Sequence, residues 1–278
     1  MDRPLLEVAD LHVTFATPKG PVEAVRGVSF TLGRERLGIV GESGSGKSQT
    51  GRAILGVVDR RAAVRAERLV FDGTDLLAAD PRTLRRLRGS RMSMILQDPK
   101  YSLNPVMPVG TQIAEAYRVH RRAGRAEARA RTLAMLEAVH IRDPERVWRA
   151  YPHELSGGMG QRAMIAMMMI AEPDLIIADE PTSALDVTVS LQVLAVLDEM
   201  VTRRGTGMIF ISHDLNLVAS FCDRVLIMYA GRVVETCAAK DLHRAQHPYT
   251  RGLLDGLPRI DRRLDPLPTL RRDPSWAR

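Results

Sequence analysis

The stretch Gly41-Glu42-Ser43-Gly44-Ser45-Gly46-Lys47-Ser48 decides the fold, because it fits the phosphate-loop pattern Gly-x4-Gly-Lys-Ser in full. The short apolar run at 37–40 before it predicts a buried strand, and residues 47–57 after it predict a helix. In such a loop, backbone N–H groups turn inward and the helix start adds its positive dipole end, so a polyphosphate binds there. We therefore expect Lys47 to reach the β and γ phosphates of ATP, and the Ser48 hydroxyl to bind Mg²⁺.

The segments on both sides of this loop alternate between strand-like and helix-like patterns. Alternating apolar residues at 5–15 and 22–32 predict two antiparallel strands near the N-terminus. Apolar runs predict further strands, and helical patterns separate them, which is typical of an α/β fold with a mostly parallel sheet. The further strands are expected at 92–96, 175–178, 208–211 and 224–228, and the helices at 187–204 and 215–221.

A charged helical pattern at 109–150 interrupts this alternation. We interpret it as an α-helical subdomain, inserted at about 105–165 into a domain that covers 1–256. Residues 257–278 are rich in proline and arginine, which predicts an extended, weakly packed tail.

Composition excludes several classes of protein. The longest apolar run, Met164 to Ala171, is too short to span a bilayer, and no signal peptide is recognised, so a cytoplasmic chain is expected. Cys222 and Cys237 are not spaced like metal ligands. The net charge of +7 alone is compatible with nucleic acid, an acidic membrane surface or solvated arginine-rich helices. The arginines are spread out with few aromatics among them, which favours solvated helices and argues against nucleic-acid binding.

A second motif, Leu175-Ile176-Ile177-Ala178-Asp179-Glu180-Pro181, is an apolar run that ends in two acids. Its strand is expected to be buried, with its carboxyl end at the crevice where ligands bind in such sheets. Adjacent side chains on a strand point to opposite sides, so we assign Asp179 to Mg²⁺ and Glu180 to the water that attacks the γ phosphate. By itself the pair is equally compatible with a strand end capped before Pro181.

A third motif, Leu155-Ser156-Gly157-Gly158-Met159-Gly160-Gln161, precedes a strongly helical run, and Ser156 is suited to cap that helix. With the three motifs in place, the sequence resembles the ATP-binding cassette (ABC) ATPases over about residues 1–255. The signature motif of that family closes over ATP held by the opposite subunit. The resemblance implies that Ser156, Gly157 and Gly158 contact ATP, and that the fold is a P-loop NTPase cassette.

The resemblance assigns further residues position by position. Gln97 resembles the loop glutamine that binds near Mg²⁺ and faces the transmembrane partner, so it is counted as metal-binding and catalytic. Asp186, in the segment 183–186, resembles the loop that contacts the opposite subunit. His213 resembles the switch histidine at the γ phosphate and joins Lys47 and Glu180 in the catalytic set. Phe15 stands where the family stacks an aromatic ring on adenine, although a core aromatic on an amphipathic strand is the alternative.

Other stretches resemble the branch of the family that powers import of oligopeptides, dipeptides or nickel. They are Gln49 and Thr50 after the phosphate loop, 97–99 leading to 102–105, the Met159 form of the signature, and His247-Pro248-Tyr249-Thr250-Arg251. The resemblance also counts Gln49 among the nucleotide-binding residues. Gly160 departs from the arginine or glutamine usual in the branch; we expect a looser helix start and retained activity. No cysteine follows Cys237, so the iron-sulfur cluster of longer members is not expected.

These resemblances imply a Mg²⁺-dependent ATPase that pairs head to tail with a second copy or a similar chain, on the cytoplasmic face of the inner membrane. Two permease subunits and an extracytoplasmic substrate-binding protein are the expected partners, and di- or oligopeptides the expected cargo. Import of nickel or another small solute is the alternative within the branch. An ABC ATPase that acts on DNA or ribosomes, and a regulatory module without turnover, are the rival classes.

Overall fold

The computed structural model describes residues 3–99, 102–183, 185–256, 273 and 276. The chain divides into two compact units, Met1–Ala79 with Ile209–Arg278, and Asp80–Met208. We call the first the nucleotide-loop unit and the second the signature unit. In the described part of the chain we find no helix with both the length and the apolar character that crossing a membrane needs.

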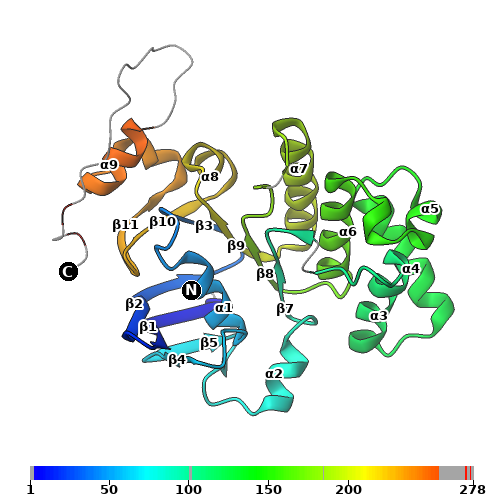
Figure 1. The fold of residues 1–278 in the computed structure, drawn as a ribbon, viewed down its shortest axis with the longest axis horizontal. Helices are drawn as coiled ribbons and strands as arrows, with labels where there is room; N and C mark the ends of the chain where they lie inside the picture. The colour runs from blue at the N-terminus through cyan, green and yellow to red at the C-terminus, as the bar shows by residue number, and fades with distance from the viewer. Residues whose placement is uncertain (1–2, 100–101, 184, 257–272, 274–275, 277–278) are drawn as a thin grey trace. The chain divides into compact units, whose positions relative to one another are not determined.

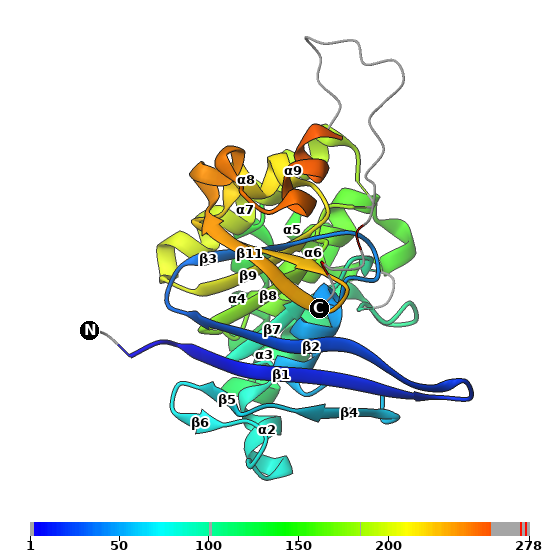
Figure 2. The same cartoon turned by 90° about the vertical axis from the view of Figure 1, so that its left-hand side faces the viewer.

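The nucleotide-loop unit begins with an antiparallel hairpin of β1 (Leu6–Thr17) and β2 (Gly20–Leu32), as predicted (Figure 2). Leu6 and Val8 of β1 are buried, and after an irregularity between Val8 and Leu11 so are Leu11 and Val13, which is the pattern of a strand with one face on a core. The hairpin belongs to a five-stranded sheet in the order β2-β1-β5-β6, with β4 also paired to β1. The three added strands are β4 (Ala62–Arg65), β5 (Arg68–Phe71) and β6 (Thr74–Asp75), none of which the sequence patterns predicted.

A second sheet of this unit holds the phosphate loop. Its strands run in the order β11-β10-β3-β9, where β10 pairs parallel with β3 and antiparallel with β11. Helix α8 packs so closely on β3 that a Cβ at Gly38 would lie 2.3 Å from Val218 Cγ1. The bounds are β3 (Arg36–Val40), β9 (Gly207–Ser212), β10 (Arg224–Tyr229), β11 (Arg232–Ala238), α1 (Lys47–Leu55), α8 (Leu215–Phe221), η3 (Ala239–Arg244) and α9 (Pro248–Asp255).

The signature unit is mainly helical, with the parallel pair of β7 (Met92–Ile95) and β8 (Leu175–Asp179) (Figure 1). Every residue of both strands is buried, as expected for parallel strands covered on both faces. The helices are α2 (Pro81–Leu87), α3 (Val109–Arg121), α4 (Arg125–Ala138), α5 (Pro144–Arg149), η2 (Pro152–Glu154), α6 (Gly157–Met169) and α7 (Val187–Arg204).

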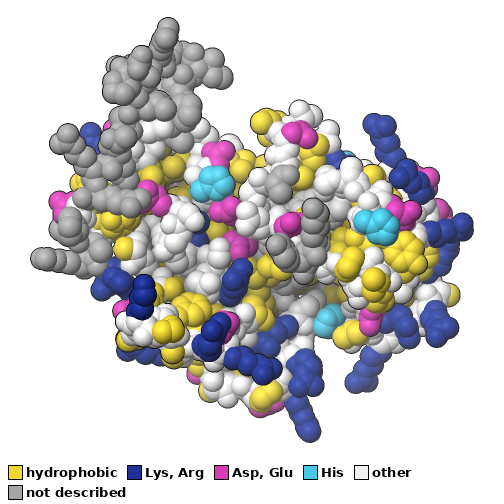
Figure 3. Space-filling model, in the orientation of Figure 1, with side chains coloured by type: hydrophobic (Ala, Val, Ile, Leu, Met, Phe, Trp, Pro, Cys, Tyr) yellow, Lys and Arg dark blue, Asp and Glu magenta, His cyan; other side chains and the backbone are white. Residues whose placement is uncertain are grey.

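Lysine and arginine side chains stand out over the segment α3–α5 in Figure 3. Arg125, Arg129 and Arg131 of α4 are among its exposed residues. This fits the interpretation of the positive charge as arginine-rich solvated helix faces. The domain boundaries at 105–165 and 256 stay predictions, and most of the predicted tail lies outside the described residues. Trp276 of that tail is described, and its ring lies 6.0 Å from the ring of Tyr249.

Candidate functional site: the phosphate loop and the signature helix

The phosphate loop joins the end of β3 to the start of α1, in the context that the motif predicted. Gly46 caps α1 with φ +101°, a left-handed conformation that favours glycine, and no side chain caps the helix. A Cβ at Gly46 would lie 2.4 Å from the Ala24 carbonyl oxygen, and one at Gly41 would lie 2.1 Å from that of Met228. The backbone around both glycines therefore fits together only without side chains.

Polar atoms inside the loop fit a polyphosphate. Lys47 is 5% exposed, and its Nζ donates to the carbonyl oxygens of Gly41 at 2.7 Å and Glu42 at 2.9 Å. The Ser45 hydroxyl is buried, and among the described residues it has no hydrogen-bond partner. An ammonium group, an unsatisfied hydroxyl and the uncapped start of α1 thus converge on one short loop, as an anion site requires. Ser48 and Gln49 follow on the first turn of α1 and are half-buried.

The two acids lie at the end of β8 in the signature unit. Asp179 is the last residue of the strand and is 5% exposed. Glu180 has left the strand: its φ of +48° is left-handed, which is uncommon for a residue other than glycine. The prediction that the two side chains alternate along a strand is therefore wrong for Glu180, because the chain turns at this residue. The turn continues with the Ser183 N–H and hydroxyl, which both donate to the Glu180 carbonyl oxygen.

Strain of this kind costs about 1–3 kcal/mol and persists only where surrounding contacts hold it. One such contact comes from Gln161 of α6, which is 1% exposed and donates through Nε2 to the Pro181 carbonyl oxygen at 2.5 Å. The signature helix is thereby connected to the residue that directly follows Glu180. Sequence reasoning gave Gln161 no role, although it stands at the end of the signature motif.

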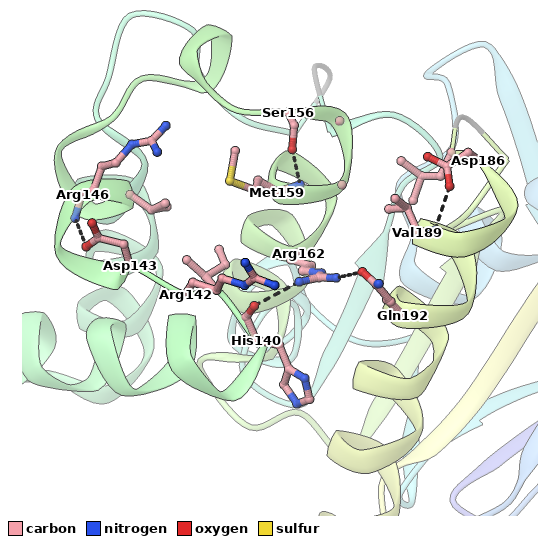
Figure 4. Close-up of a pocket in the computed structure, with 15 residues that line it drawn as sticks. His140, Arg142, Asp143, Arg146, Ser156, Met159, Arg162, Asp186, Val189 and Gln192 are labelled. Atoms are coloured by element: carbon pink, nitrogen blue, oxygen red, sulfur yellow. Dashed lines mark hydrogen bonds between the residues drawn. The ribbon is translucent and has the colours of Figure 1, made fainter.

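The signature motif opens α6 as predicted. The Ser156 hydroxyl accepts from the Met159 N–H at 3.4 Å, and the helix then continues through Gly160. The Asp186 carboxylate caps α7 in the same way, accepting from the Val189 N–H at 2.9 Å. Both helix starts border a pocket of about 570 Å³, which Figure 4 shows.

Arg162 spans this pocket and connects three elements. One guanidinium nitrogen donates to the His140 carbonyl oxygen at 3.0 Å, and the other donates to the side-chain oxygen of Gln192 on α7 (Figure 4). Because Arg162 itself belongs to α6, it ties the α4–α5 loop and α7 to the signature helix. The sequence patterns gave Arg162 no role, although it directly follows the signature motif.

Close packing of α6 on α7 gives a testable difference between neighbouring glycines. A Cβ at Gly158 would lie 2.5 Å from Val189 Cγ1, whereas one at Gly157 would meet Leu185 at an ordinary 3.7 Å. Gly158→Ala is expected to lower the free energy of unfolding by about 1–3 kcal/mol. The matched control Gly157→Ala is expected to leave it unchanged or slightly raised, because alanine favours helices. Urea unfolding followed by circular dichroism measures both, and equal values for the two variants would contradict the packing described.

The remaining predicted residues lie in either unit. In the signature unit, Gln97 follows β7 by two residues and is exposed. In the nucleotide-loop unit, His213 directly follows β9 and is exposed, and half-buried Phe15 lies on β1 opposite Val22 and Ala62. The structure thus brings the residues 41–48 together in one loop, and Ser156–Gly158 with Asp186 around one pocket. The roles given to all these residues stay predictions.

Neither cysteine has the character of a nucleophile. Burial raises the pKa of the Cys222 thiol to about 12. Burial, with the nearby carboxylates of Glu235 and Asp241, also raises the pKa of Cys237. Both thiols therefore stay protonated at neutral pH.

Comparison with known proteins identifies the family. Residues 25–183 match the ABC transporter family. The chain is 49% identical over 259 residues to the oligopeptide transport ATP-binding protein OppD of Salmonella typhimurium, covering 92% of this chain and 77% of OppD. It is 46% identical over 260 residues to the dipeptide transport ATP-binding protein DppD of Bacillus subtilis, covering 92% and 78%.

Among solved structures, the dimeric bacterial ABC transporter cassette MJ0796 has a TM-score of 0.75 at 24% identity, covering 84% of this chain and 98% of that chain. That likeness confirms the predicted fold, a P-loop cassette with an antiparallel β subdomain and helical segments. The family match and the curated relatives confirm the resemblance seen in the sequence. The chain therefore belongs to the ABC transporter family, as an ATP-hydrolysing subunit.

Proposed function

We propose that this chain hydrolyses ATP to power an importer of di- or oligopeptides. The observation that carries the proposal is the phosphate loop, with its buried lysine and its buried, unsatisfied Ser45 hydroxyl, in a chain whose relatives are named for peptide transport. The loop accounts for nucleotide binding. The relatives account for the cargo, because nothing in the described part of this chain selects a peptide by itself.

Each of the predicted site residues has its own role in the proposed reaction. Lys47 exchanges its two carbonyl partners for phosphate oxygens, whose negative charge makes stronger hydrogen bonds to the ammonium group than neutral carbonyls do. The Glu180 carboxylate orients the attacking water and accepts its proton. His213 contacts the γ phosphate, and Gln97 senses Mg²⁺ and faces the transmembrane partner. Phe15 is proposed to stack on adenine.

A Mg²⁺ ion fits the oxygen donors assigned to it, the Ser48 hydroxyl, the Asp179 carboxylate and the Gln97 side chain, since hard cations prefer oxygen ligands. When bound, it neutralises charge on the phosphates. Asp179 suits this role because it places a carboxylate, a ligand that Mg²⁺ prefers, at the end of β8.

We further propose that the chain works as one of two ATPase subunits, with Ser156, Gly157, Gly158 and Asp186 facing the nucleotide of the opposite subunit. In this proposal the chain lies at the cytoplasmic face of the membrane, and two membrane-spanning permease subunits and an extracytoplasmic binding protein complete the assembly. Ser156 and Asp186 support this, because each starts a helix and both line one pocket.

The experiment that tests the function starts from native membranes. The tagged chain is purified in mild detergent, copurifying proteins are identified by mass spectrometry, and uptake of labelled dipeptides, longer peptides and nickel is measured in cells with and without the gene. Integral membrane permeases and a loss of peptide uptake are expected. Loss of nickel uptake alone would show that the cargo is nickel and not a peptide. Copurifying DNA or ribosomes without permeases would overturn the transport function.

A further inference from the structure

The motif His247-Pro248-Tyr249-Thr250-Arg251 has no part in the function proposed so far. It opens α9, where His247 caps the helix by accepting from the Tyr249 N–H through Nδ1 at 3.2 Å. The Tyr249 side chain is 0% exposed and is the largest fully buried side chain of the described residues. Its hydroxyl accepts a hydrogen bond from the Glu42 backbone N–H at 3.0 Å. We propose that Tyr249 is a positioning residue that holds the phosphate loop in its ATP-binding conformation, an inference that rests on the proposed function.

The contact falls on Glu42, the second residue of the loop, which also has a hydrogen bond to Lys47. The Glu42 N–H donates to Tyr249, while the Glu42 carbonyl oxygen accepts from Lys47 Nζ at 2.9 Å. If Lys47 turns to phosphate, the carbonyl loses that partner and the bond to Tyr249 remains. The Glu42 N–H thus stays bonded to Tyr249, and the later residues of the loop bind the phosphates.

Other contacts to the loop come from the end of β10 and from the turn between β10 and β11. The Gly231 N–H donates to the Ser45 carbonyl oxygen at 3.0 Å, and the Met228 carbonyl is so close to Gly41 that it excludes any side chain there. Tyr249 joins this support from another element, α9. The phosphate loop is therefore held by the turn near Ser45 and by the tyrosine at Glu42.

Neighbouring rings fix the position of the Tyr249 hydroxyl. The ring of Tyr229, the last residue of β10, lies 4.6 Å from that of Tyr249 at an angle of 49°. The Trp276 ring lies 6.0 Å from Tyr249 and 6.0 Å from His247. Aromatic pairs at these separations are attractive, and packing on several sides leaves the buried ring one position. The hydroxyl is consequently preorganised for Glu42 before any nucleotide binds.

Tyr249→Phe tests the proposal, because it keeps the ring and removes only the hydroxyl. The variant is expected to weaken ATP binding about 3- to 10-fold and to raise the KM for ATP similarly, with a smaller change in kcat. Hydrogen–deuterium exchange at the Glu42 amide is expected to speed up by about 10-fold in the absence of nucleotide. A purely structural role would lower the melting temperature without these two effects.

Tyr117→Phe is the matched control. The Tyr117 hydroxyl donates to Glu127 at 3.0 Å in the signature unit, so the control also removes one phenol hydrogen bond of equal length. It is expected to leave ATP affinity and Glu42 exchange unchanged. The proposal is overturned if Tyr249→Phe stays within about twofold of wild type in both readouts. If the wild-type chain binds no ATP, the proposed function fails, and the exchange measurement still decides whether Tyr249 holds the loop.

Discussion

Glu180→Gln is expected to lower the rate of steady-state ATP hydrolysis by about 10²- to 10⁴-fold. The amide keeps the size of the side chain and one oxygen that accepts hydrogen bonds, but it cannot accept a proton from the attacking water. ATP binding is expected to persist, and the variant should accumulate as an ATP-loaded dimer in size-exclusion chromatography. Hydrolysis is measured as released phosphate from the purified chain with its copurified partners.

Glu172→Gln is the control for this variant. Like Glu180, Glu172 has a left-handed backbone, with φ +58°. Its side chain pairs with arginines, including Arg204 at 2.9 Å, and is 48% exposed. The control therefore repeats the chemical change and the unusual backbone at a surface position, and it should hydrolyse ATP at the wild-type rate. Normal hydrolysis by Glu180→Gln would remove Glu180 from the catalytic set.

Lys47→Met is expected to weaken ATP binding by about 100-fold or more, because it removes charge-assisted hydrogen bonds to phosphate. Methionine has nearly the length of lysine and is apolar, so it can occupy the buried position without leaving an unpaired charge. Equilibrium titration with a fluorescent ATP analogue measures the loss of affinity.

Lys19→Met serves as the control, since Lys19 is exposed in the turn between β1 and β2. It should bind ATP as the wild type does. If Lys47→Met binds ATP with an unchanged Kd, the phosphate loop is not the nucleotide site, and the function built on it is wrong.

Most of the central fold could be predicted because its segments have strong patterns of their own. Helix α7 has the predicted bounds 187–204, and the parallel strands β7 and β8 are short apolar runs. The strands β4, β5 and β6 were missed because they have two to four residues each, and β4 and β5 each include an exposed arginine. Such short strands depend on hydrogen bonds to their partners more than on a pattern of their own.

Two other missed elements carried local signals. Helix α2 begins with Asp80 as its cap and Pro81 in its first turn, and α9 begins with His247 and Pro248 in the same arrangement. Both helices are short, seven and eight residues, so their apolar periodicity is weak. The start signals were present, but without a periodic segment behind them they did not predict a helix.

The candidate site was predictable where neighbouring residues form it and unpredictable where distant residues meet. The residues 41–48 act as one motif, and Ser156 caps its helix from within its own motif. The left-handed turn at Glu180 and the bond between Gln161 and Pro181 depend on the folding of separate segments. Glu42 and Tyr249 are 207 positions apart, so only the fold connects them.

The most direct measurement of the proposed function uses the chain together with its copurified membrane proteins, reconstituted in vesicles with the binding protein. Phosphate release and accumulation of a labelled peptide are recorded with and without ATP and Mg²⁺. We expect ATP hydrolysis and peptide accumulation together, both lost in Lys47→Met. Peptide accumulation at the same rate without ATP, or with Lys47→Met, would contradict the claim that this chain powers import.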